Sequence, residues 1–208
     1  MTRRIGILVD GRSEFFGLPH LVPRLRTRAA VLNPLYCDMQ PLAPIPQIAN
    51  AAAKRIPILL TRGITHILLL IDLEQRAECA PEIASRLKSE VIKRIPSKPA
   101  LGVDVVVKVR TFENWLIADP ECLKSSPAMF HDTHRISTSV ANDRADQVDA
   151  QALLKDCTTK RHFNKVAIAQ AICARQDPDR AALTSRSYRR FLRVIRASPY
   201  LHQSRSPV

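Results

Sequence analysis

The sequence has 208 residues, which allows one large core, and its hydrophobic fraction of 46% excludes wholesale disorder; its formal net charge is +13. Its apolar runs are too short for a transmembrane helix or a signal peptide, and its five scattered cysteines form no C-x-x-C pair. We therefore expect a cytoplasmic globular protein with reduced thiols, and neither a disulfide framework nor a zinc knuckle.

The first part of the chain predicts two strands and the helix between them. Residues 4–10 form an apolar strand that ends in an acid, and Ser13 is the expected N-cap of a helix over residues 14–26. Residues 29–37 predict a second strand, which is interrupted or ended near Pro34.

A helix and the central strand follow. Apolar residues at helical spacing predict a helix over residues 48–62, with Gly63 as its C-cap. Ile67 to Ile71 are five consecutive apolar residues, which is typical of a strand buried on both faces of a parallel sheet. That strand stops at Asp72, and residues 81–95 then have the pattern of an amphipathic helix.

The fourth strand is predicted over residues 101–109, where β-branched residues are frequent. A short helix within residues 110–119 is expected to end at Pro120. Residues 125–149 are polar and weakly patterned, and we interpret them as a loop or lid. Helices are predicted over residues 161–174, 178–183 and 187–197.

Strands that alternate with helices predict an α/β fold with a Rossmann-like, mostly parallel sheet of about four strands. We place an α/β core in residues 1–124, and a loop with a basic helical extension, packed on that core as one unit, in residues 125–208. Residues 155–208 contain twelve Lys and Arg against three acids, or +9 of the total charge. This concentration of positive charge favours binding to a polyanion or to an acidic protein partner, although basic residues also solvate helix faces.

Acidic side chains follow three of the predicted strands. Asp10 follows the first strand, Asp72 and Glu74 follow the central one, and Glu113 lies just beyond the fourth. If the chain stays extended after Asp72, the carboxylates of residues 72 and 74 point the same way. Parallel strands bring their carboxyl ends to one edge, where such acids would bind Mg²⁺ or Mn²⁺ for phosphodiester cleavage. Helix caps and surface ion pairs are the alternative interpretation.

Basic residues supply candidate phosphate contacts. Arg12 and Ser13 stand at a helix start that could hold a phosphate. The C-terminal candidates for contact with a nucleic-acid backbone are Lys160, Arg161, Lys165, Arg186, Arg189, Arg190 and Arg193. An acidic partner subunit would suit the arginines equally well. Trp115 is expected to be core packing.

Several motifs resemble those of Toprim-like proteins. Residues 7–14 (I-L-V-D-G-R-S-E) resemble the V-E-G-x-S/T-E start, and residues 71–74 resemble the D-x-D strand end. Residues 112–119 (F-E-N-W-L-I-A-D) are similar to the E-x-W-L-x-A-D signature of the bacterial Toprim-like family of unknown function numbered 4276. Residues 160–165 and 185–191 are similar to its C-terminal lysine and S-x-S-F segments, so the resemblance spans about residues 5–195.

The resemblance implies a Toprim-like fold in which a Glu and a D-x-D bind Mg²⁺. The matching positions here are Asp10 for the Glu, Asp72 and Glu74 for the D-x-D, and Glu113 for the family acid. It also implies a nuclease in prokaryotic anti-phage defence, controlled by an ABC-type ATPase subunit. Asp10 is one methylene shorter than the family Glu, and Glu74 is one longer than the family Asp.

Our leading hypothesis is therefore a Mg²⁺-dependent nuclease, in which Asp10 or Glu113 helps to deprotonate water. Two alternatives remain open on the sequence alone. One is a non-catalytic Toprim shell that binds a partner protein or nucleic acid through its basic helices. The other is a PIN- or NYN-like ribonuclease, which also begins with a strand that ends in Asp-Gly.

Overall fold

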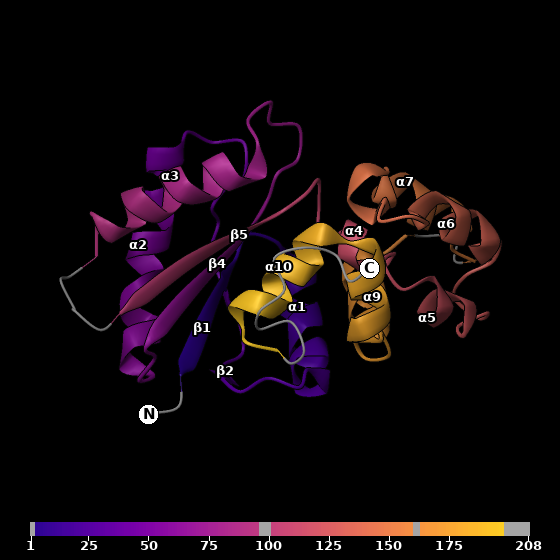
Figure 1. Ribbon diagram of the computed structural model, residues 1–208, viewed down its shortest axis with the longest axis horizontal. Helices are drawn as coiled ribbons and strands as arrows, with labels where there is room; N and C mark the ends of the chain where they lie inside the picture. The colour runs from indigo at the N-terminus through magenta and orange to yellow at the C-terminus, as the bar shows by residue number, and fades with distance from the viewer. Residues whose placement is uncertain (1–2, 96–100, 160–162, 198–208) are drawn as a thin grey trace.

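A computed structural model of the protein describes residues 3–95, 101–159 and 163–197 (Figure 1). The fold is built on a parallel sheet in which strands β2, β1, β4 and β5 lie side by side, while β3 also pairs with β1. The α/β class and the parallel sheet confirm the sequence prediction. The strands are β1 (Arg4–Val9), β2 (Ala30–Val31), β3 (Leu35–Tyr36), β4 (His66–Asp72) and β5 (Gly102–Lys108).

The sheet has five strands because the predicted second strand is split in two. The short strand β2 pairs with the start of β1, and the equally short β3 pairs with its end. Pro34 lies between them, where a residue without a backbone N–H cannot continue the ladder.

Both faces of the sheet are covered, which explains the uninterrupted apolar runs. In β4, Leu68 and Leu70 belong to one buried cluster, whereas Ile67, Leu69 and Ile71 belong to another on the opposite face. Successive side chains of a strand point to opposite faces, so a strand between two helical layers must be apolar throughout. The second face is covered by α2 (Ile45–Thr61) and α3 (Ala80–Ile92).

Two predicted helix boundaries are corrected by the structure. Helix α1 (Arg12–Leu21) begins earlier than expected: its N-cap is Gly11, and Ser13 lies inside the first turn. A 3₁₀ turn, η1 (Val22–Arg24), follows it. Helix α2 ends with Arg62 as the C-cap, and Gly63 takes the left-handed conformation (φ 69°) just beyond.

Residues 125–149 do not form the loop or lid that their polarity suggested. They contain α6 (Thr133–Val140) and a 3₁₀ turn, η2 (Ala145–Gln147). Ile136 and Ala145 are fully buried in the first cluster. The sequence pattern is weak because Ser and Thr dominate the helix surface, and tertiary burial overrides their low helix propensity.

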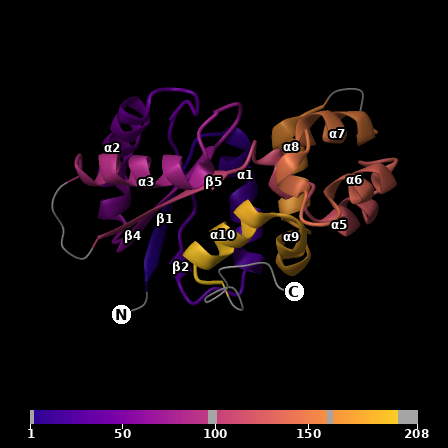
Figure 2. The same ribbon diagram turned by 45° about the horizontal axis from the view of Figure 1, so that its top comes forward.

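The remaining helices gather at one side of the sheet, except for the last. Helices α5 to α9, within residues 120–184, lie together there, whereas α10 (Arg186–Val194) returns and packs against β5 (Figures 1 and 2). One buried cluster contains residues of the strands, of this group of helices and of α10, which joins residues 125–159 and 163–197 to the sheet. These helices are α4 (Glu113–Leu116), α5 (Pro120–Lys124), α7 (Ala150–Cys157), α8 (Lys165–Cys173), α9 (Pro178–Thr184) and α10 (Arg186–Val194).

No helix in the described part of the chain is both long and apolar enough to cross a membrane. All five cysteines are free thiols, and four of them are buried. Burial raises the pKa of the Cys37 and Cys122 thiols to about 11, so these groups behave as small core residues.

Candidate metal centre

Three carboxylates meet at the carboxyl edge of the sheet. Asp10 follows β1, Asp72 ends the neighbouring strand β4, and Glu14 lies in the first turn of α1. One carboxylate oxygen from each residue lies within 4.8 Å of the others. Asp10 Oδ2 also accepts a hydrogen bond of 2.9 Å from the backbone N–H of Asp72, which links the two strand ends directly. We call these three residues the acid cluster.

Gly11 allows the acid cluster to form. A Cβ atom at this position would lie 2.2 Å from Glu14 Oε2, which is closer than any real contact. The Asp-Gly step therefore permits the chain to turn from β1 into α1 while the Glu14 carboxylate lies over the backbone.

Lys108 places a positive charge inside the acid cluster. It is the last residue of β5, pairs in register with Asp72, and is fully buried. Its Nζ lies 2.9 Å from Asp10 Oδ1 and 3.1 Å from Asp72 Oδ1, and it also contacts Glu14 Oε1. The ammonium also lies over the Phe112 ring, 5.8 Å from its centre.

Burial and mutual repulsion control ionisation in this cluster. Burial raises the pKa of Asp72 well above its usual value against the opposing charge of Lys108, and Asp10 and Glu14 add to the rise. Burial likewise raises the pKa of Glu14. Burial acts to lower the pKa of Lys108, yet that pKa lies well above its usual value because three carboxylates stabilise the ammonium.

The donor set fits a small divalent cation. Asp72 Oδ1 is buried and, within the described part of the chain, accepts no hydrogen bond, even though the Lys108 ammonium is within ion-pair distance. When all three carboxylates are ionised, they and the Lys108 ammonium carry a formal charge of −2, which one divalent cation would balance. Such a cation would also favour the ionised forms of Asp72 and Glu14, whose pKa burial raises. Carboxylate oxygens without imidazole or thiolate are the ligands that Mg²⁺ and Mn²⁺ prefer.

Glu74 is not one of the three clustered carboxylates. Strand β4 ends at Asp72, and Glu74 adopts a left-handed conformation (φ 50°) while its N–H donates to the Arg110 carbonyl. The extended geometry that would align residues 72 and 74 therefore does not continue past the strand. The condition for the two carboxylates to point the same way, an extended chain after Asp72, is not met.

Glu113 also lies outside the acid cluster, at the start of α4. Its side chain is nearly buried, with Oε1 3.8 Å from Lys165 Nζ and Oε2 accepting from Gln151 Nε2 at 3.5 Å. The structure thus joins two residues that the sequence assigned to separate roles, the family acid and a C-terminal lysine.

The other predicted contacts fall in several places. Arg12 is exposed at the start of α1, whereas Ser13 beside it is buried. Arg186 and Arg190 are exposed on α10, and Arg193 is partly buried. Lys160 and Arg161 lie outside the described residues.

Arg189 has a structural environment. Its guanidinium makes a bidentate pair with Asp143 at 2.9 and 2.8 Å and donates to the Ala182 carbonyl. The side chain is largely buried, so this arginine braces α10 instead of facing a ligand.

The motifs over residues 112–119 and 185–191 have structural roles. Trp115 is buried, as predicted, and its Nε1 donates to Ser187 Oγ at 2.7 Å. Asp146 accepts hydrogen bonds from the Ser185 hydroxyl and from the hydroxyl and N–H of Ser187, which accounts for both serines of the S-x-S segment. Asp119 is fully buried and receives the Arg180 guanidinium at 2.8 and 3.0 Å.

Sequence reasoning missed two members of the site. Glu14 enters the sequence prediction as a helix residue and as the last acid of the Toprim-like start, but not as a metal ligand, although its D-G-x-x-E spacing puts its carboxylate over the turn. Lys108 was counted only as part of a strand. A lysine in an otherwise apolar run, at the carboxyl end of a buried parallel strand, is the signal that could have revealed it, because such a charge needs buried partners.

Residues 9–196 match the model of the family described as "Domain of unknown function (DUF4276)", which covers nearly the whole chain. Among solved structures, the chain is similar to the C-terminal region of the Burkholderia pseudomallei OLD protein, with 17% identity and a TM-score of 0.47. That alignment covers 94% of this chain and 98% of the other. No curated protein matches.

Proposed function

The chain belongs to the DUF4276 family, and on that premise we propose that it is a divalent-metal-dependent phosphodiesterase acting on nucleic acid. The observation that supports this most directly is the acid cluster, in which three carboxylates from the end of β1, from α1 and from β4 converge on one ammonium. The Toprim-like motifs and the net charge of +13 support the same substrate class. The family match favours this resemblance over a PIN- or NYN-like one.

Asp10, Glu14 and Asp72 would hold the cation, which we propose is Mg²⁺ or Mn²⁺. A cation bound there would polarise a phosphoryl oxygen of the substrate and lower the pKa of a bound water. Lys108 offsets part of the carboxylate charge and keeps the side chains of Asp10 and Asp72 in place as an anionic substrate approaches. Glu113, oriented by Gln151, is the carboxylate we assign to accept a proton from water.

Two finer proposals rest only on the resemblance of the motifs. We propose that the enzyme is the effector of a prokaryotic anti-phage system and that an ABC-type ATPase subunit controls it. Glu74 also remains a candidate ligand in this proposal. Its carboxylate would join the acid cluster only after a change in the conformation of the loop that follows β4.

The direct test is cleavage of plasmid, linear DNA and tRNA by the full chain with Mg²⁺, with Mn²⁺ and with EDTA. We expect metal-dependent cleavage that falls by at least about a hundredfold in Asp72→Asn and in Glu14→Gln. Glu121→Gln, which removes an exposed carboxylate from α5, is the matched control. Cleavage that persists undiminished in both cluster variants would place the chemistry elsewhere.

One observation favours a second candidate, a non-catalytic shell that binds a partner protein or nucleic acid. Lys108 already supplies a cation to all three carboxylates, and a buried network of this kind can serve the fold alone. The two candidates differ in metal binding. A shell without a metal site keeps the same melting temperature when EDTA is exchanged for Mg²⁺, whereas the phosphodiesterase gains stability on binding the ion.

A further inference from the structure

A pocket of about 470 Å³ lies at the amino edge of the sheet, opposite the acid cluster. Strand β4 runs from His66, which contacts the pocket residue Asp104, to Asp72 in the cluster, and it spans about 20 Å. The pocket is therefore separate from the proposed metal centre. Its lining includes five arginines, namely Arg3, Arg28, Arg190, Arg193 and Arg196.

The pocket has a strongly positive field. Among the described residues, Asp104 is the one acid in its lining, so the lining has a formal charge of +4. Asp104 already lies 2.9 Å from His66, 3.3 Å from Arg3 and 3.4 Å from Lys88. Its carboxylate is thus shared among three basic side chains, two of which, His66 and Lys88, lie outside the pocket lining.

The end of α10 is built in an unusual way at this pocket. The N–H of Ala197 donates to the Leu192 carbonyl and the N–H of Arg196 donates to the Arg193 carbonyl, which is the Schellman pattern. Glycine normally occupies the left-handed position of that motif, but here Arg196 adopts it with φ 59°. A residue with a Cβ is disfavoured in this conformation, so Arg196 is held in a strained backbone geometry while it lines the pocket.

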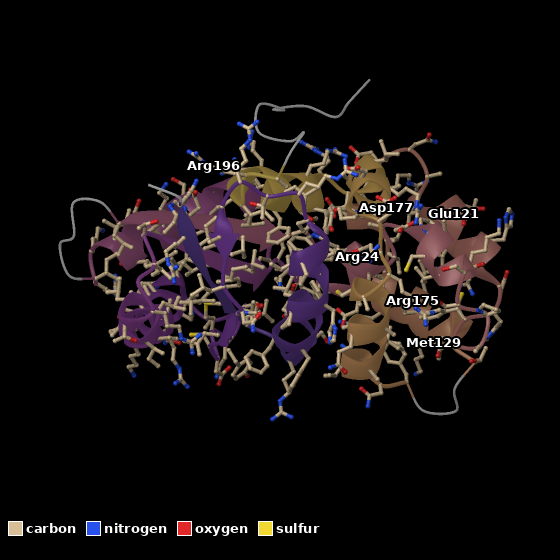
Figure 3. All side chains as sticks on the ribbon, turned by 90° about the horizontal axis from the view of Figure 1, so that it is seen from below. Arg24, Glu121, Met129, Arg175, Asp177 and Arg196 are labelled. Carbon is tan, nitrogen blue, oxygen red and sulfur yellow. The ribbon has the colours of Figure 1, made fainter. Side chains whose placement is uncertain are left out.

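Backbone contacts hold two of the arginines side by side. The N–H of Arg28 donates to the Arg196 carbonyl at 3.2 Å, and Thr27 and Ala197 form an isolated antiparallel bridge. Figure 3 shows Arg196 at the end of α10 that lies nearest the strands. Arg190 is exposed on α10 itself, six residues before Arg196. Basic side chains from three segments therefore converge on a fixed frame.

We propose that this pocket is a second, non-catalytic anion site that binds clustered phosphate groups through its guanidinium groups. Guanidinium groups match phosphate oxygens in pairs, and several of them around one pocket suit neighbouring phosphates better than a single carboxylate. The phosphates come either from a nucleic-acid backbone or from the polyphosphate chain of a nucleotide. Phosphate binding at this pocket does not depend on hydrolysis at the acid cluster.

The test uses the full chain in EDTA, so that binding is measured without cleavage. A short labelled single-stranded DNA is titrated by fluorescence anisotropy, and inorganic tripolyphosphate and ATP are titrated separately and as competitors. The variant is Arg28→Gln with Arg190→Gln, two exposed positions. The control is Lys54→Gln with Arg55→Gln, which removes the same charge from the exposed surface of α2.

We expect the pocket variant to lose about tenfold or more in affinity, with a salt slope for DNA reduced by about 1 to 1.5, while the control changes by less than about threefold. Loss of DNA binding with displacement by tripolyphosphate identifies the nucleic-acid backbone as the source. If the pocket variant loses affinity for tripolyphosphate and ATP but keeps its affinity for DNA, the phosphates come from a nucleotide. Equal affinities of the pocket and control variants for every probe would overturn the proposal.

Discussion

At the scale of single residues, Lys108 decides how the acid cluster is interpreted. A fully buried lysine is stable only with partners, and this one has three carboxylates within reach. The ammonium holds the cluster together in the absence of a metal, and with all three carboxylates ionised a formal charge of −2 is left. The residue therefore limits the site to one divalent cation in our account.

Replacement of Lys108 by methionine should make the fold depend on metal. Without the ammonium, the three carboxylates face each other in a buried place, and we expect a loss of about 3–5 kcal/mol in the free energy of unfolding in EDTA. Mg²⁺ should restore much of that loss, because the cation then has three uncompensated ligands. The measurement is urea unfolding at about pH 8 with and without Mg²⁺.

Lys93→Met is the control, since this lysine is exposed and its ammonium forms a surface ion pair with Glu90. It should cost less than about 1 kcal/mol in either buffer. If Lys108→Met is destabilised equally in EDTA and in Mg²⁺, the lysine supports packing alone.

Asp104 should make stability depend on pH in the acidic range. Burial opposes its ionisation, but the hydrogen bond from His66 and the charges of His66 and Lys88 hold its pKa below the usual value. A carboxylate with a lowered folded-state pKa contributes stability above its unfolded pKa, near 4, and loses that contribution as pH falls through the folded value.

The comparison is between the wild-type chain and Asp104→Asn, by chemical unfolding at several pH values. We expect the wild type to be more stable at about pH 6 and the difference to shrink steadily below about pH 4. A difference that stays constant down to about pH 3 would show that the charge of Asp104 does not contribute.

At the scale of elements, the E-x-W-L-x-A-D motif acts as a joint between two parts of the fold. Asp119 caps α5 through the Cys122 N–H, accepts from the Asp177 N–H at 2.8 Å, and pairs with Arg180 at the start of α9. Trp115, in the helix before it, packs edge-on against Tyr188 of α10. The motif therefore ties α4 and α5 to the last two helices.

Asp119→Ala should loosen this joint. The change leaves the Asp177 N–H and the Arg180 guanidinium without their buried acceptor, at a cost of about 2–4 kcal/mol in the free energy of unfolding. Hydrogen exchange should speed up in α9 before it does so in β4. Glu121→Ala, which removes an exposed carboxylate from α5, is the control. Uniform acceleration across the sheet and α9 would contradict a local joint.

Prediction at this scale succeeded where the pattern was strong. The apolar runs gave β1, β4 and β5, and Pro34 marked the break between β2 and β3. Helix α6 was missed because its exposed face is rich in Ser and Thr, and its stability comes from the burial of a few residues such as Ile136.

At the scale of the whole molecule, opposite charges occupy opposite edges of one sheet. The acid cluster lies at the carboxyl ends of β1 and β4, and the arginine pocket lies at the amino ends of β1 and β5. Alternation of strands and helices was enough to predict that Asp10 and Asp72 would meet. It could not predict that Lys108 would fill the space between them, because register between strands is set by the whole fold.

The central claim is that the acid cluster binds one divalent cation, and calorimetric titration of Mn²⁺ into the full chain, freed of metal with EDTA, tests it most directly. We predict one ion bound per chain, and loss of that binding in Asp10→Asn combined with Glu14→Gln. Glu121→Gln combined with Asp156→Asn removes two exposed carboxylates and should bind the ion as the wild type does. The account is contradicted if the wild type binds no ion, or if the cluster variant binds it with unchanged affinity.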